Sequence, residues 1–88
     1  MVVWTEYLKY RAQVRGFDLT KIEQVVRSST ERYVDTVTGR RVVIGHHHKT
    51  LVMIPYEADE TSIRPITIHV TTRQQINVRL RTGRFTHV

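Results

Sequence analysis

The residues best suited to chemistry lie in the last third of the chain, within a run of arginines. Arg73, Asn77 and Arg81 recur at four-residue spacing, which places them on one face of a helix as a polar stripe. His69 precedes this run, and Arg84 lies just beyond it. A histidine can transfer a proton to or from a phosphodiester while arginines hold the phosphate. The pattern therefore predicts a catalytic site formed by His69, Arg73 and Arg81.

The charge distribution favours a polyanionic partner, RNA above all, for this part of the chain. The 88 residues carry a formal net charge of +6, and residues 61–88 contain five arginines and no acid. Residues 1–60 are nearly balanced, with nine basic and eight acidic side chains. The planar guanidinium matches phosphate with two parallel hydrogen bonds, and a basic domain attracts polyanions over long distances. The further candidates for nucleic-acid contact are Arg64, Asn77, Arg79 and Arg84.

Three histidines, His46, His47 and His48, are adjacent in the sequence. Histidine is a common metal ligand, but the spacing of these three is not that of a metal site. Adjacent residues on a strand point to opposite faces, and no cysteine or paired acid at ligand spacing accompanies them. We predict no metal here, and the triplet is left open between contact with RNA and simple exposure. Because the 2′-hydroxyl of RNA can serve as nucleophile, the expected cleavage needs neither metal nor cofactor.

The helices that must position these residues are predicted from apolar spacing and caps. One helix is expected over residues 3–15 and a second from Asp18 to the Ser28-Ser29-Thr30 cluster. A third is expected over residues 72–82, because Thr72 begins a capping-box pattern and Gly83 suits the end of a helix.

Between the second and third helices the apolar period changes to that of β-strands. Four strands in an antiparallel meander are expected at residues 33–34, 41–45, 49–56 and 66–70. The chain is therefore predicted to be one α+β domain over residues 1–88, with two N-terminal helices, a four-stranded sheet and a C-terminal helix.

Composition narrows the setting in which such a domain works. There is no cysteine, which argues against a disulfide-stapled secreted protein, and no apolar run approaches the roughly 20 residues that span a membrane. Charged residues occur too early for a signal-peptide core. We expect a cytoplasmic protein without membrane contact. Exposed sheet edges would permit a homodimer but do not require one.

Several segments resemble small prokaryotic domains of unknown function related to BrnT-type toxins. The similar segments are Tyr7–Arg11, Arg15–Phe17, Ile22–Val26, Glu31–Asp35, Thr38–Arg40, Ile68–His69, Thr71–Asn77 and Gly83–Phe85. The resemblance covers nearly the whole chain without including a diagnostic catalytic signature. The middle strands depart from the toxin pattern, because they carry few basic residues apart from Arg40, Arg41 and Lys49.

The resemblance implies a RelE-like fold, in which a curved antiparallel sheet holds RNA against basic residues. It further implies a toxin that cleaves RNA and is neutralised by an antitoxin, here an acidic protein. The matching basic positions are His69, Arg73, Arg81 and Arg84. Two other functions fit the same residues: a nucleic-acid-binding or regulatory module without catalysis, and a protein-interaction domain whose basic helix docks an acidic partner. His69 would then be only an exposed residue on the sheet.

Overall fold

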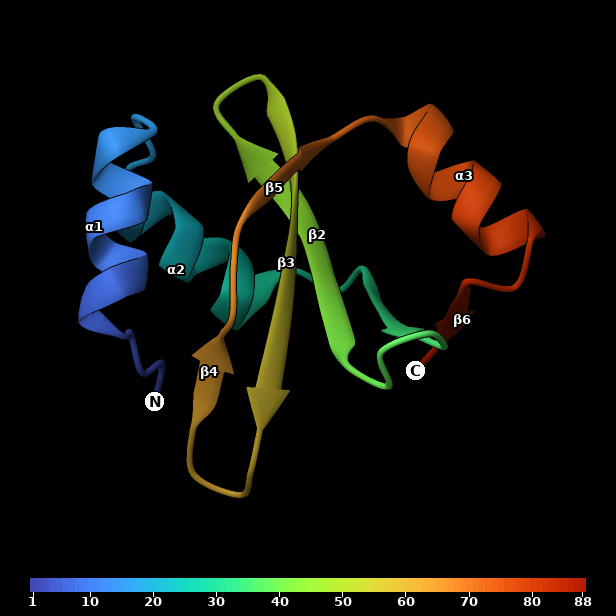
Figure 1. The fold of residues 1–88 in the computed structure, drawn as a ribbon, viewed down its shortest axis with the longest axis horizontal. Coiled ribbons are helices and arrows are strands. Elements are labelled where there is room, and N and C mark those ends of the chain that lie inside the picture. The colour runs from blue at the N-terminus through green and yellow to red at the C-terminus, as the bar shows by residue number, and fades with distance from the viewer.

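An antiparallel sheet of six strands separates two groups of helices in the computed structural model, which describes residues 1–88. Helices α1 (Glu6–Val14) and α2 (Leu19–Ser28) pack on one face, and α3 (Arg73–Arg81) lies on the other (Figure 1). The predicted α+β class, with two N-terminal helices and a later third helix, is confirmed. The sheet has six strands rather than the four that we predicted.

The two long central strands of the sheet form a hairpin to which shorter strands are added on both sides. The order across the sheet is β4-β3-β2-β1-β6, and β5 also pairs with β3. The strands are β1 (Arg32–Asp35), β2 (Arg41–His47), β3 (Thr50–Ala58), β4 (Ile63–Pro65), β5 (His69–Thr71) and β6 (Phe85–His87).

Each helix begins at a residue whose side-chain oxygen accepts a hydrogen bond from the first turn. The Thr5 hydroxyl accepts from the Leu8 amide at 3.1 Å, so α1 begins later than the predicted residue 3. Asp18 and Thr72 cap α2 and α3 in the same way, as their sequence patterns predict. Gly83 follows α3 with a φ of 77°, the left-handed conformation that ends many helices.

The predicted strand at residues 66–70 is wrong in its bounds, because residues 66–68 form a bulge between two short strands, β4 before it and β5 after it. Tyr56 of β3 pairs with Pro65, and Met53 pairs with His69. The two residues of β3 between these pairs therefore lie opposite three residues, 66–68. One extra residue of this kind interrupts the ladder and reverses the facing of the residues that follow. The bulge thus places His69 on the α3 side of the sheet.

Strand β6 was not predicted, and it follows the helix that we expected to be the last element. It pairs with β1 in antiparallel register, with Phe85 opposite Asp35 and His87 opposite Tyr33. The rings of Tyr33 and Phe85 stack with centroids 5.6 Å apart. The segment after α3 is thereby fixed to the edge of the sheet.

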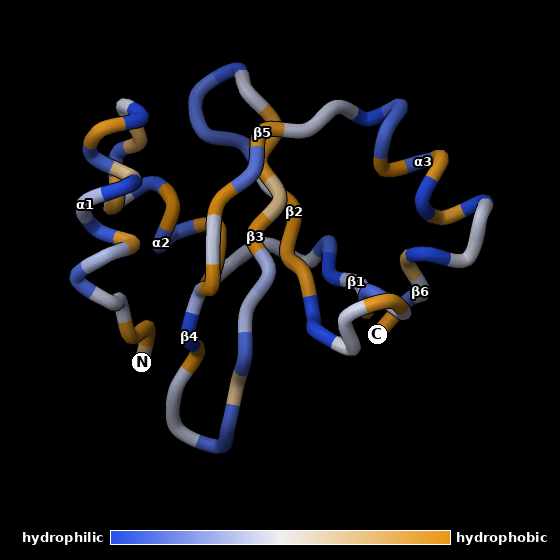
Figure 2. Tube along the Cα trace, in the orientation of Figure 1, coloured by the Kyte–Doolittle hydropathy of each residue, from blue (hydrophilic) through white to orange (hydrophobic).

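Two apolar clusters, one on each face of the sheet, hold the layers together. The larger one lies under α1 and α2 and includes Ile22, Val26 and Val43. The smaller one lies under α3 and includes Ile76 and Phe85. Figure 2 shows the hydrophobic stretches concentrated in the central strands, with hydrophilic loops at their ends. None of the three helices combines the length and the apolar character that a membrane crossing requires.

Candidate nucleic-acid interface

His69 lies on the edge strand β5, exposed on the α3 side of the sheet. The preceding residue, Ile68, is almost fully buried in the cluster under α1. Neighbouring side chains on this segment point to opposite faces of the sheet, so Ile68 packs in the core while His69 stays accessible. The next alternate residue, Thr71, donates a hydrogen bond to Gln75 of α3 at 3.0 Å. This contact ties β5 to the first turn of α3 and holds the edge strand in place beside the helix.

The positive charges of two arginines act on His69, Arg15 from the residue after α1 and Arg79 from α3. Partial burial, and then the charges of Arg15 and Arg79, hold the pKa of His69 below its usual value of 6.5. The lowered pKa favours the neutral imidazole, the form that can accept a proton. We call these three residues, His69, Arg15 and Arg79, the His69 cluster.

The contacts of Arg15 explain why this residue stays beside β5. It follows α1 directly, and its Nη1 donates to the carbonyl oxygen of Ile68 at 2.7 Å. Its guanidinium lies over the ring of Phe17, 5.1 Å from the centroid. This role could not be predicted from the sequence, because Arg15 and His69 are far apart in the chain and come near each other only in the folded protein.

Arg79 approaches the cluster from α3. Its guanidinium lies over the ring of Phe85, with the central carbon 5.6 Å from the centroid, and it has no carboxylate partner. Arg81, which we grouped with His69 and Arg73, is exposed and makes no ion pair or hydrogen bond. Residues 79 and 81 are separated by about 200° around the helix axis, so Arg81 does not share the direction of Arg79. Asn77 is also exposed and without a partner.

Three other candidate arginines are paired with carboxylates. Arg73 forms a two-point pair with Glu31, and Arg84 forms one with Asp35 at 2.8 and 3.1 Å. Arg64 lies 3.7 Å from Glu57. The acids that neutralise these arginines come from residues 1–60, so a count of charge by segment overstated the free charge at the C-terminal end.

The basic side chains without a carboxylate partner lie on all layers of the molecule. They are Arg11, Arg15, Lys21, Arg32, Arg41, Lys49, Arg79 and Arg81. Within this set, Arg15 and Arg79 are the arginines whose charges lower the pKa of His69. The His69 cluster therefore combines accessible positive charge with a group that can transfer a proton.

The three adjacent histidines lie in different environments, and only the rings of His47 and His48 touch, edge to face with centroids 4.5 Å apart. His47 is buried, and its Nε2 accepts a hydrogen bond from the Asp18 amide at 2.9 Å. His46 is exposed on β2, and His48 lies in the following turn with a φ of 56°. No group of three or more histidines and acids in the structure is arranged to hold a metal ion. His47 therefore has a structural role, because it fixes the start of α2 against the end of β2.

No family model, curated protein or solved structure matches this chain. The similarity to BrnT-type toxins stays a prediction from the sequence, and the function has to be inferred from the residues themselves.

Proposed function

We propose that the protein is an RNA-cleaving toxin of a toxin–antitoxin pair, and that it binds its substrate at the His69 cluster. One observation carries this proposal: His69 is exposed, and its pKa is lowered by partial burial and by the charges of Arg15 and Arg79, neither of which has a carboxylate partner. Such a surface attracts a phosphodiester and offers a proton acceptor at the same place.

The cleavage step follows from the chemistry of RNA itself. His69 takes the proton of a 2′-hydroxyl, and the 2′-oxygen then forms a bond to the adjacent phosphorus while the bond to the 5′-oxygen breaks. The products are a 2′,3′-cyclic phosphate and a 5′-hydroxyl end, with the leaving oxygen protonated from water. Arg15 and Arg79 stabilise the additional negative charge on the phosphate during the displacement. Asn77 and Arg81 on α3 would contact neighbouring parts of the strand.

The proposed antitoxin is an acidic protein that covers the same surface. The exposed side of α3 carries Arg81 without an ion-pair partner, and the His69 cluster lies beside this helix. An acidic partner would neutralise these charges and exclude RNA by occupying the site.

Growth after induced expression tests the proposal in cells. Wild-type protein should arrest growth, and His69→Ala should relieve the arrest because the proton acceptor is lost. Soluble expression should stay equal, because the removed side chain is exposed. Arg81→Lys serves as a matched control that keeps the charge on α3. Persistent arrest by soluble His69→Ala protein would contradict the proposed role of His69.

A second function, binding of RNA without cleavage, is favoured by the composition of the cluster. His69 is the one residue of the cluster that can exchange a proton near neutral pH. The cluster contains no second residue of this kind that could protonate the leaving oxygen. This reading expects RNA affinity that falls steeply with salt while the RNA stays intact during long incubation.

A further inference from the structure

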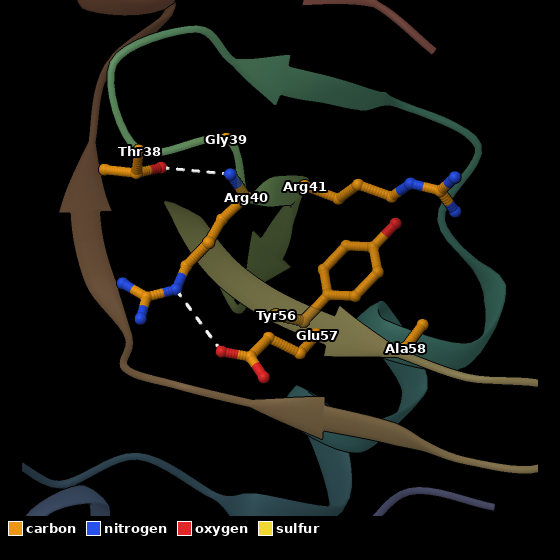
Figure 3. A pocket seen from close by; sticks show the side chains of 7 residues that line it. All are labelled: Thr38, Gly39, Arg40, Arg41, Tyr56, Glu57 and Ala58. Carbon is orange, nitrogen blue, oxygen red and sulfur yellow. Dashed lines mark hydrogen bonds and ion pairs between the residues drawn. The ribbon is translucent and has the colours of Figure 1, made fainter.

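A second group of arginines surrounds an open hollow at the far end of the central hairpin. The hollow has a volume of about 790 Å³ and lies between the segment leading into β2 and the end of β3. Figure 3 shows the side chains that line it, among them Arg40, Arg41, Tyr56 and Glu57. It is separate from the His69 cluster, because none of its lining residues belongs to that cluster and because Tyr56 and His69 lie on opposite faces of the sheet.

Tyr56 is the unusual residue in this hollow. Its side chain is almost entirely buried, with 4% of the residue exposed, yet its hydroxyl has no hydrogen-bond partner. The structure contains no side-chain nitrogen or oxygen that is both fully buried and unpartnered, so this hydroxyl keeps some access to solvent, and Tyr56 is one of the residues that line the hollow. A buried ring with an unpartnered hydroxyl at the surface is a ready hydrogen-bond donor for a ligand.

Positive charge lies on both sides of this hydroxyl. Arg41 is the cross-strand neighbour of Tyr56, is exposed, and has neither an ion-pair nor a hydrogen-bond partner. Figure 3 shows its side chain extending on the side toward which the Tyr56 hydroxyl points. The guanidinium of Arg32 lies over the tyrosine ring, 5.4 Å from the centroid, and is held there by the carbonyl oxygens of Val26 and Ser29.

The one acid lining the hollow is directed away from this hydroxyl. Glu57 follows Tyr56 on β3, so its side chain emerges on the opposite face. Its carboxylate lies 3.5 Å from Arg40 and 3.7 Å from Arg64, and Figure 3 shows it turned toward Arg40. The acid is thereby neutralised, and the charge near the Tyr56 hydroxyl stays positive.

From this arrangement we infer a phosphate-binding site formed by Arg41 and the hydroxyl of Tyr56, with Arg32 as a fixed second charge. Arg41 would donate two hydrogen bonds to the phosphate oxygens and Tyr56 a third. The phosphate could belong to a free phosphate ion or to the 5′ end of a nucleic acid, since both present the same oxygens. This site does not depend on RNA cleavage at His69.

Titration with inorganic phosphate, followed by the amide and arginine side-chain signals in NMR spectra, tests the site directly. We expect the signals of Arg41 and Tyr56 to shift in a saturable way. Tyr56→Phe keeps the packed ring and should weaken binding by about tenfold, since it removes a hydrogen bond to a charged group. Arg41→Ala should weaken it at least as much, whereas Arg81→Ala, on another layer, should leave it unchanged.

Two RNA oligonucleotides that differ only in a 5′-phosphate distinguish the sources of the ligand. Tighter binding of the phosphorylated oligonucleotide, lost in Tyr56→Phe, would assign the site to a nucleic-acid end. Equal binding of both, together with saturable phosphate binding that Tyr56→Phe weakens, would assign it to small phosphorylated ligands. The inference is overturned if phosphate produces no saturable shift, or if folded Tyr56→Phe and Arg41→Ala bind phosphate as tightly as wild type.

Discussion

The guanidinium of Arg73 donates two hydrogen bonds to the carboxylate of Glu31, and the hydroxyl of Tyr33 donates a third to the same carboxylate at 2.7 Å. These contacts join the start of α3 to the segment that leads into β1. The hydrogen bonds from Arg73 are also the main reason that the pKa of Glu31 lies below its usual value of 4.5. Arg73 is thus engaged within the fold, although its position in the sequence suggested a phosphate ligand.

We therefore expect Arg73→Ala to act on stability. Loss of this partly exposed pair should lower the free energy of unfolding by about 1 kcal/mol, measured by urea denaturation. RNA affinity of the folded protein should change by less than about twofold, because the variant loses only a distant positive charge that salt largely screens. Arg81→Ala removes an unpaired arginine from the same helix and should leave stability nearly unchanged. Full stability of Arg73→Ala with loss of RNA binding would return Arg73 to the binding site.

The pKa of His69 should rise when either neighbouring arginine is removed. Partial burial and the charges of Arg15 and Arg79 disfavour the imidazolium, so Arg79→Ala and Arg15→Ala should each move the pKa upward toward 6.5. The measurement is an NMR titration of the His69 ring signals. Arg81→Ala provides the control with equal loss of charge on α3. An unchanged pKa in both test variants would mean that the three residues do not form a cluster in solution.

Asp35 should make the protein sensitive to acid. The hydrogen bonds from Arg84, followed by those from the Val37 and Thr38 amides, lower the pKa of this buried carboxyl from its usual 3.8. A lowered folded-state pKa gives stability that is present above pH 3.8 and is lost as the pH falls through the folded-state value. Asp35→Asn should therefore be less stable than wild type at neutral pH and lose less stability on acidification. Parallel pH profiles of the urea midpoint for the two proteins would contradict this.

Gly45→Ala should destabilise the contact between β2 and α2. A Cβ atom at this position would lie 2.5 Å from Cγ1 and 2.9 Å from Cγ2 of Val25, a short branched side chain with little freedom to move. The expected cost is about 1–3 kcal/mol in the free energy of unfolding. The double variant with Val25→Ala should recover part of this loss, because the obstructing methyl groups are gone. Additive losses in the double variant would contradict the proposed clash.

The helices of this protein could be predicted from the sequence because their determinants are local. Asp18 and Thr72 lie one residue before the helices that they cap, and Gly83 adopts the left-handed conformation that its position after α3 suggests. The buried stripe of α2 likewise follows from apolar residues one turn apart, such as Ile22 and Val26.

The remaining features depend on contacts between distant segments, for which one sequence contains no signal. The bulge at residues 66–68 becomes visible only when both strands are paired with β3, and β6 is too short for its apolar period to be recognised. The same limit applies to the arginines. The carboxylate partner of Arg73 lies 42 residues earlier in the chain, so paired and unpaired arginines looked alike in the sequence.

Incubation of purified protein with single-stranded RNA in the presence of a chelator is the most direct test of the His69 cluster. Wild type should yield 2′,3′-cyclic phosphate ends, and a substrate with 2′-deoxy sugars should stay intact. His69→Ala should lower the cleavage rate by about 10²-fold or more, and Arg15→Ala with Arg79→Ala should also lower it, whereas Arg73→Ala should cleave at nearly the wild-type rate. Cleavage by His69→Ala at the wild-type rate, or no cleavage by folded wild type that binds RNA, would contradict catalysis at this cluster.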